Sequence, residues 1–339
     1  MKKILVTGGA GFIGYNICRM LAEKEGNHIY IMDNLSKAGM DEEFQGLIKN
    51  RNVTFYNLDM TDPASFDRIQ QEYDQIYHLA AVVGVRKVTE NPDLTIRVNT
   101  LSTIYLLEMI KRAGNRPRIL FTSSSENYAG SLKHCNVAVP TPENIPLCIE
   151  DIKNPRWSYA ASKIIGEIAC YHYAEMYGFE SIIVRYHNVY GPRMGTQHVI
   201  PEFIRRLKDT PGRLDMFGGY QYRSFSYVTD AARMTIGLMN NDRAPGKVIN
   251  IGNDLEQIRI ADIGIQLCTI MGISPEIVEH GAPDGSVGVR MPDLTTIREL
   301  GAYVFDIPFH DGLLSTYEWY DQHLPGKKLA PAALISKPA

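Results

Sequence analysis

The sequence has no cysteine clusters, no long apolar runs and no excess of one charge, and each absence excludes a class of protein. Its 339 residues carry a formal net charge of −3, which gives no general attraction to nucleic acid or to an acidic membrane. No apolar run approaches the roughly 18 residues of a membrane-spanning helix, so no membrane partner is expected. The cysteines form no C-x-x-C pair, which argues against a bound metal or a disulfide framework and suits the cytoplasm. They are Cys18, Cys135, Cys148, Cys170 and Cys268.

What the sequence does contain is a regular alternation of short β-branched or aromatic runs with helical patterns. At this spacing the alternation predicts βαβ units, and therefore an α/β fold with a Rossmann-type doubly wound parallel sheet. In such a sheet the ligand lies beyond the carboxyl ends of the strands. Strands are expected at 3–7, 28–33, 53–59, 75–81, 118–124 and 181–186, and helices at 12–25, 94–113 and 158–177.

A glycine-rich loop follows the first predicted strand and opens the first helix. Gly8, Gly11 and Gly14 have the spacing G-x-x-G-x-x-G, a variant of the Rossmann pattern. Without side chains, the backbone can turn tightly and approach a pyrophosphate. The helix begins at Phe12 and Ile13, where unpaired N–H groups and the helix dipole favour an anion. The loop therefore predicts a dinucleotide site.

Acidic residues at the ends of the second and third strands complete this site. Asp33, followed by Asn34, lies about 20 residues beyond the loop, where a carboxylate binds both ribose hydroxyls of NAD and repels the 2′-phosphate of NADP. The pair Asp59-Met60 is expected either to bind the adenine or to cap the helix that follows Thr61. The expected cofactor is therefore NAD.

These features divide the chain into three parts. Residues 1–186 are expected to form the NAD-binding Rossmann domain, to which later segments return. After Tyr186 turn-forming pairs become frequent, so residues 187–325 are expected to form mainly a smaller, mixed C-terminal substrate lobe. Residues 326–339 are rich in Pro, Ala and Lys and are expected to be a flexible tail.

Tyr159 and Lys163 lie one turn apart on a predicted helix and therefore share a face. Ionising a tyrosine of ordinary pKa at pH 7 costs about 4 kcal/mol, which a close lysine and a nicotinamide cation can offset. Such a phenolate can take a proton from an alcohol while its hydride passes to NAD. Ser123, Ser124 and Ser125, at the end of the fifth strand, are placed to hydrogen-bond the same substrate. We expect at least one of them only to satisfy the backbone there.

Five motifs resemble, in order, those of the extended short-chain dehydrogenase/reductase family of nucleotide-sugar epimerases, dehydratases and decarboxylases. They are TGGAGFIG (7–14), HLAA (78–81), FTSSSENY (121–128), YAASK (159–163) and RYHNVYGPR (185–193). The resemblance implies that Ser124 hydrogen-bonds the substrate, Tyr159 is the acid/base and Lys163 stabilises the phenolate. It also places Ala80 and Asn99 in the cofactor set, Asn99 as a structural residue.

The resemblance further implies an enzyme that holds NAD tightly, oxidises a sugar at C4 and later returns the hydride, so that the net reaction is redox-neutral. Asn188 resembles the family's diphosphate-contacting asparagine, and Arg223 and Arg290 resemble its phosphate-binding arginines, whose guanidinium forks suit phosphate oxygens. Ser125 is expected beside the sugar. The implied substrate is a UDP- or GDP-linked sugar, and the implied assembly is a homodimer through the helices at 94–113 and 158–177.

Glu126 separates the reactions open to this family. C4-epimerases usually carry a small residue there, whereas decarboxylases and 4,6-dehydratases carry Glu, which can remove the C5 proton that a C4 ketone makes acidic. Dehydratases place an Asp before this Glu, where this chain has Ser125. The Ser-Glu pair and Arg156-Trp157 are more similar to UDP-glucuronate decarboxylases. RYHNVYGP is also similar to GDP-mannose 3,5-epimerase, in which a cysteine takes the position of Glu126.

We therefore expect a nucleotide-sugar epimerase/dehydratase-type enzyme that works through a transient 4-keto sugar. The alternatives are a UDP-glucuronate decarboxylase, a 4,6-dehydratase and a dehydrogenase that releases NADH. Glu126 itself is expected to be catalytic, with an inert, paired carboxylate as the other interpretation.

Overall fold

A computed structural model describes residues 1–37, 39–70, 72–282 and 286–324, so the tail expected at 326–339 lies outside the described residues. Its centre is a seven-stranded sheet of order β11-β6-β5-β4-β1-β2-β3, in which every neighbouring pair is parallel. The prediction of a doubly wound parallel sheet is therefore confirmed. The strands are β1 (Lys2–Thr7), β2 (Asn27–Asp33), β3 (Val53–Asn57), β4 (Gln75–His78), β5 (Arg118–Ser124), β6 (Glu180–Tyr186) and β11 (Val248–Ile251).

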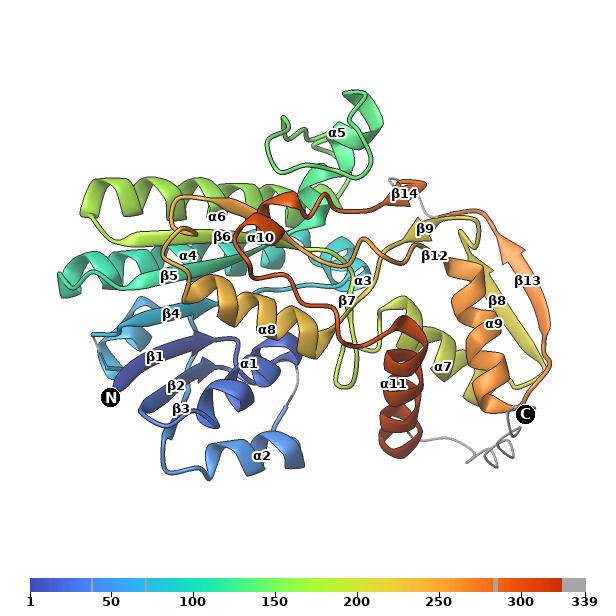
Figure 1. The fold of residues 1–339 in the computed structure, drawn as a ribbon, viewed down its shortest axis with the longest axis horizontal. Coiled ribbons are helices and arrows are strands. Elements are labelled where there is room, and N and C mark those ends of the chain that lie inside the picture. The colour runs from blue at the N-terminus through green and yellow to red at the C-terminus, as the bar shows by residue number, and fades with distance from the viewer. Residues whose placement is uncertain (38, 71, 283–285, 325–339) are drawn as a thin grey trace.

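Helices cover both faces of this sheet (Figure 1). Successive side chains of a strand point to opposite faces, so Ile4 and Val6 join one core while Leu5 joins the other. The first core includes residues of α1 (Phe12–Ala22), α2 (Glu42–Ile48) and α8 (Val228–Met239), and the second includes residues of α4 (Pro92–Ala113) and α6 (Trp157–Tyr177). Short helices lie between the longer elements: η1 (Pro63–Arg68), α3 (Val85–Glu90), η2 (Ser125–Tyr128), α5 (Ala129–His134) and α10 (Thr295–Glu299).

Two strands end earlier than the sequence predicts. β3 ends at Asn57 and β4 at His78, whereas the expected strands continue to residues 59 and 81. The pairing of β1 with β4 stops at Thr7 and His78, after which both segments leave the sheet. Asp59 and Ala80 therefore lie in loops beyond the carboxyl ends of the strands, where a ligand binds in this class of sheet.

A second group of elements forms a smaller lobe with mixed sheets, visible beside the main sheet in Figure 1. Its strands pair in three small sheets, β10-β7, β12-β9-β14 and β13-β8. β12 is antiparallel to β9, whereas β14 is parallel to it. The elements are β7 (Val189–Tyr190), α7 (Val199–Asp209), β8 (Arg213–Phe217), β9 (Tyr222–Arg223), β10 (Ser226–Tyr227), β12 (Ile258–Arg259), α9 (Ile260–Met271), β13 (Glu276–His280), β14 (Val289–Arg290) and α11 (Phe309–His323).

Between these segments the chain returns to the main sheet. α8 packs on α1, and β11 forms the sheet edge by pairing with β6. Within the described residues, no helix is long and apolar enough to span a membrane.

Candidate active site

A cavity of about 820 Å³ lies beyond the carboxyl ends of the central strands, bordered by the second lobe. The strand order reverses between β1 and β4, which is where such sheets bind ligands. The volume of the cavity is typical of a small-molecule site. Among the predicted site residues, those that line it are Gly8, Gly11, Phe12, Ile13, Gly14, Asp33, Asn34, Asp59, Met60, Ala80, Ser124, Ser125, Glu126, Tyr159, Lys163, Asn188 and Arg290.

The glycine loop packs so closely on neighbouring backbone that side chains on Gly8 and Gly14 would not fit, and this close packing leaves its outer side free for a dinucleotide. Gly8 has a φ of +70°, and a Cβ there would lie 2.7 Å from the backbone nitrogen of Ala80. A Cβ on Gly14 would overlap the carbonyl oxygen of Gly8. The loop thus packs backbone to backbone against the segment after β4, and the N-terminus of α1 lines the cavity.

The two acidic residues of the cofactor region are fixed by nearby hydrogen bonds. The Asp33 carboxylate accepts from the backbone N–H groups of Ala10 at 3.0 Å and Leu35 at 2.8 Å. Burial raises the pKa of Asp33, against the effect of these bonds. Asp59 accepts from the N–H and hydroxyl of Thr61, both at 2.8 Å, and lines the cavity. The helix that follows is capped by Asp62 and not by Asp59, so the capping alternative is wrong.

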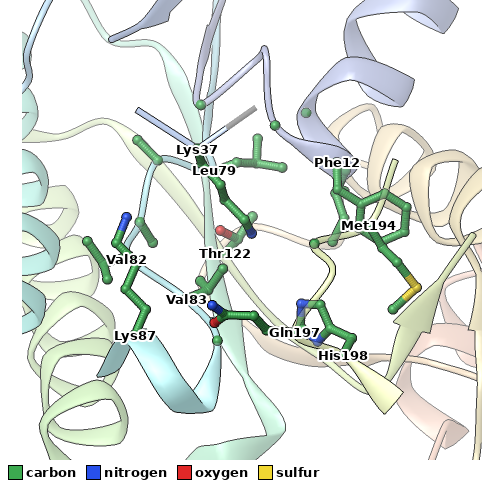
Figure 2. Close-up of a pocket in the computed structure, with 18 of the residues that line it drawn as sticks. Phe12, Lys37, Leu79, Val82, Val83, Lys87, Thr122, Met194, Gln197 and His198 are labelled. Atoms are coloured by element: carbon green, nitrogen blue, oxygen red, sulfur yellow. The ribbon is translucent and has the colours of Figure 1, made fainter. Parts of the chain in front are cut away.

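A group of basic side chains in this part of the cavity was not predicted from the sequence. Figure 2 shows Lys37, Lys87 and His198 around the cavity, from three separate segments. A Cβ on Gly195 would lie 3.5 Å from Lys37 and 3.6 Å from the His198 ring, so the lysine side chain crosses toward the second lobe. Burial and the neighbouring Lys87 lower the pKa of Lys37 to about 8. Burial and Lys37 lower the pKa of His198 to about 4. Mutual repulsion of this kind favours an anionic ligand.

Arg193 connects the second lobe to the glycine loop. Its guanidinium donates to Asp41 at 2.7 Å, to Glu43 at 3.2 Å and to the carbonyl of Ala10 at 3.1 Å. It also lies over the ring of Tyr15 at 4.0 Å. Arg193 was part of a sequence motif without a predicted role, because its partners lie about 150 residues away in the sequence.

The predicted catalytic residues Ser124, Tyr159 and Lys163 meet at the carboxyl end of β5. A Cβ on Gly166 would overlap the ring of Phe121, so this glycine lets α6 press against the strand. Lys163 can then donate to the carbonyl of Thr122 at 2.7 Å. Burial lowers the pKa of Lys163 to about 8. Burial also raises the pKa of Tyr159 to about 12, while a hydrogen bond with Ser124 acts in the opposite direction.

Glu126 lies among arginines beside this group. It accepts from Arg290 at 2.7 Å and from Arg156 at 3.3 Å. Although burial raises its pKa, the two guanidinium groups prevail and lower it to about 2. The carboxylate is therefore ionised and paired. Arg223 is close enough that burial, Arg290 and Arg156 lower its pKa to about 9, although it does not itself line the cavity.

The two predicted asparagines differ in where they lie relative to the cavity. Asn99 is 3% exposed, binds both backbone groups of Val82 and donates to the hydroxyl of Ser162 at 3.0 Å. It supports the wall and is not among the lining residues. Asn188 does line the cavity, and its amide donates to the carbonyl of Ser224 at 2.9 Å.

A buried ion pair lies next to the carboxyl end of β5. Arg185 of β6 donates to both carboxylate oxygens of Glu167, at 2.8 and 2.6 Å. The hydroxyl of Ser123 and the amide of Asn127 donate to the same carboxylate. Ser123 thus makes a structural contact at the strand end, as expected for at least one of the serines, and all three serines line the cavity. Among the described residues, no group of His, Cys, Asp and Glu side chains is placed to hold a metal ion.

Comparison with known proteins agrees with this geometry. The model of the NAD dependent epimerase/dehydratase family matches residues 4–252. A UDP-N-acetyl-alpha-D-glucosaminuronate decarboxylase of Bacillus cytotoxicus is 31% identical, over 94% of this chain and 98% of the relative. A UDP-glucuronate 4-epimerase of Thermodesulfobacterium geofontis is also 31% identical, over 96% and 98%. The solved UDP-glucuronic acid 4-epimerase of Bacillus cereus, in complex with UDP-glucuronic acid and NAD, is 27% identical over 95% and 99%, with a TM-score of 0.83. The chain belongs to the NAD-dependent epimerase/dehydratase family and is an NAD-dependent enzyme.

Proposed function

We propose that this enzyme decarboxylates a UDP-linked uronic acid through a C4 ketone. The observation that carries the proposal is the group of arginines, Arg156, Arg223 and Arg290, near the carboxylate of Glu126 at the Tyr159 end of the cavity. A nucleotide-linked uronate carries a diphosphate and a sugar carboxylate, and guanidinium groups bind both kinds of anion. The named relatives that act on uronic acids support the same substrate class.

Tyr159, Ser124 and Lys163 would perform the oxidation. The Tyr159 phenolate takes the proton from O4 of the sugar, with Ser124 hydrogen-bonded to the same oxygen. Because burial holds the pKa of Tyr159 near 12, the phenol needs cationic help to ionise, and Lys163 supplies part of it. When bound, NAD would supply the hydride acceptor for C4 and a positive charge beside the phenol. The glycine loop and Asp33 would hold it.

Oxidation at C4 places a ketone β to the C6 carboxylate. The C5–C6 bond then breaks, its electron pair forms an enolate with the C4 ketone, and C6 leaves as carbon dioxide. A proton from solvent adds to C5, and return of the hydride to C4 restores an alcohol. The net reaction consumes one proton, releases carbon dioxide and leaves the cofactor unchanged.

Glu126 is placed to control the proton at C5. As long as Arg290 and Arg156 hold it, its pKa of about 2 makes it a weak base. A substrate anion that binds Arg290 removes one of these partners, which raises the pKa of Glu126 and lets it relay a proton. Its basicity would therefore depend on a bound substrate.

A second candidate is epimerisation of the same uronate at C4, which the similarity to UDP-glucuronate 4-epimerases supports. The two reactions share the C4 ketone and differ in whether the C5–C6 bond survives. In an epimerase the ketone turns in the site and receives the hydride on its other face, and no carbon dioxide forms.

The experiment supplies the purified enzyme with UDP-glucuronate in deuterated water and follows gas and products by mass spectrometry and NMR. Decarboxylation gives carbon dioxide, a pentose nucleotide with deuterium at C5 and no accumulating NADH. Carbon dioxide should be absent with UDP-glucose, the matched substrate without a carboxylate. Glu126→Gln should slow the step after oxidation, so that reduced cofactor and 4-keto sugar accumulate. A UDP-hexuronate product without gas release would replace this proposal with the epimerase.

We further propose that the enzyme is a cytoplasmic homodimer formed through α4 and α6. Exposed apolar side chains on these helices support the contact, and free thiols support the location. The exposed apolar side chains are Ile96, Ile165, Ile168, Tyr171, Met176 and Tyr177. Light scattering should give twice the chain mass of 38.1 kDa, and Ile168→Glu should reduce it to one chain. A parent protein of single-chain mass would contradict the proposal.

A further inference from the structure

Two cysteines separated by 13 positions lie side by side next to α5. The Sγ atoms of Cys135 and Cys148 are 3.3 Å apart. Cys135 is exposed and Cys148 is partly exposed, so small reagents can reach the pair. The other cysteines, Cys18, Cys170 and Cys268, are buried. The spacing in the sequence contains no sign of this pair, because the contact depends on how the chain folds back after α5.

Contacts on both sides of the thiols hold the two chain segments together. The hydroxyl of Ser131 donates to the carbonyl of Pro146, and Lys133 forms an ion pair with Glu150. A Cβ on Gly130 would overlap the carbonyl oxygen of Cys148, so the backbones are in close contact. The two sulfur atoms therefore face each other in a fixed setting and need to approach by little more than 1 Å to reach a disulfide bond length of about 2 Å.

The loop between the cysteines reaches the segment that carries Arg290. Thr141 forms a β-bridge with Pro292, and its N–H donates to the carbonyl of Met291 at 2.8 Å. The Glu143 carboxylate accepts from the backbone N–H of Asn250 at 3.0 Å. In Figure 1 α5 stands out from the body of the molecule above this region. A covalent bond between Cys135 and Cys148 would therefore restrain a loop that contacts the segment next to Arg290.

We propose that Cys135 and Cys148 form a reversible dithiol–disulfide site. A low-molecular-weight disulfide is the oxidant: one protein thiolate attacks it, forms a mixed disulfide and releases one thiol. The second protein thiolate then attacks the protein sulfur of this mixed disulfide, and the remaining half of the reagent leaves as a thiol. Two protein thiols become one disulfide while the reagent is reduced to two thiols, so electrons and atoms balance. The bond closes residues 136–147 into a loop and holds them against the segment that follows Arg290.

The test treats the folded, reduced protein with glutathione disulfide, alkylates the remaining thiols and digests the chain with trypsin. Cleavage after Lys133 and Lys153 leaves both cysteines in one peptide, 134–153. We expect this peptide to lose the mass of two hydrogen atoms and to take up no alkyl group, and dithiothreitol to reverse the change. The buried cysteines should stay unmodified until the protein is denatured, which provides an internal control.

Matched variants and hydrogen exchange complete the test. Cys135→Ser and Cys148→Ser should each retain one glutathione as a stable mixed disulfide, because the second attack is missing. Backbone amides at 136–147 should exchange more slowly after oxidation of the parent and at an unchanged rate in the variants. Two glutathiones on the parent peptide, two unreacted thiols, or a disulfide between two chains would overturn the proposal. None of these readouts depends on the reaction that the enzyme catalyses.

Discussion

Gly14→Ala should impair the cofactor site more than its small size suggests. The added Cβ would overlap the carbonyl oxygen of Gly8 and would lie 2.9 Å from the Cα of Gly9. These are backbone atoms, so no side chain can rotate away, and the first turn of α1 must shift. Overpacking of this kind costs about 1–3 kcal/mol. The shift also moves the N–H groups that face the pyrophosphate, so NAD binding should fall with stability.

Thermal unfolding with and without NAD separates the two effects. At an NAD concentration of about 100 times its Kd, binding should stabilise the parent protein by about 2.7 kcal/mol. Gly14→Ala should unfold at a lower temperature without NAD and show little further increase with it. Gly11→Ala, whose Cβ would lie 3.1 Å from the same carbonyl oxygen, should be less affected.

Gly46→Ala is the control, since nothing lies within 4 Å of its Cβ and it is inside α2. Alanine should leave NAD binding intact there and add up to about 1 kcal/mol of stability through helix propensity. If Gly14→Ala kept the full NAD-dependent increase in Tm, the close packing of the loop would not be what forms the site.

Three further predictions concern single side chains. Tyr159→Phe should keep its circular dichroism spectrum and bound NAD but lose about 10²–10⁴-fold in turnover, and substantial remaining turnover would assign the proton transfer to another group. The pKa of Glu126 is lowered from 4.5 to about 2, so its ion pairs contribute about 3 kcal/mol above pH 4.5 that is lost as the pH falls toward 2. Urea unfolding of Glu126→Gln should therefore show a shallower loss of stability over this range, and parallel curves would contradict the pairing. Lys87→Ala should weaken NAD binding about tenfold by calorimetry, which corresponds to about 1.4 kcal/mol for the loss of a charge near the cofactor phosphates. Arg86 is an exposed neighbour that is paired with Glu90, so Arg86→Ala should leave NAD binding unchanged.

The sequence predicted the parts of the site that depend on short segments. The strand at 118–124 was placed at its observed ends, and the glycine loop and the Tyr159–Lys163 pair face one cavity. Each of these signals is local, because side-chain periodicity and turn chemistry act over a few residues. β3 and β4 ended early because the pairing between neighbouring strands decides where a strand stops, and an apolar run does not report it.

The contacts that complete the site join residues far apart in the sequence. Arg290 reaches Glu126 across 164 positions, and Arg193 reaches Asp41 across 152. Their strength depends on how each guanidinium is buried and oriented, which no single segment contains. Lys37 and Lys87 were missed for the same reason, since each reads as an ordinary surface lysine in its own segment.

The route of the chain between the two lobes limits how this enzyme can be divided. β6 has β5 on one side and β11, from residues 248–251, on the other. A fragment that ends at residue 186 would lack β11 and expose a row of unpaired N–H and C=O groups on β6, and it would lack α8, whose Ala231 and Met234 belong to the core. During synthesis the seven-stranded sheet therefore cannot be completed until residue 251 has left the ribosome. A chimera with a relative would have to exchange several separate segments, since no single cut releases the second lobe as a transferable block.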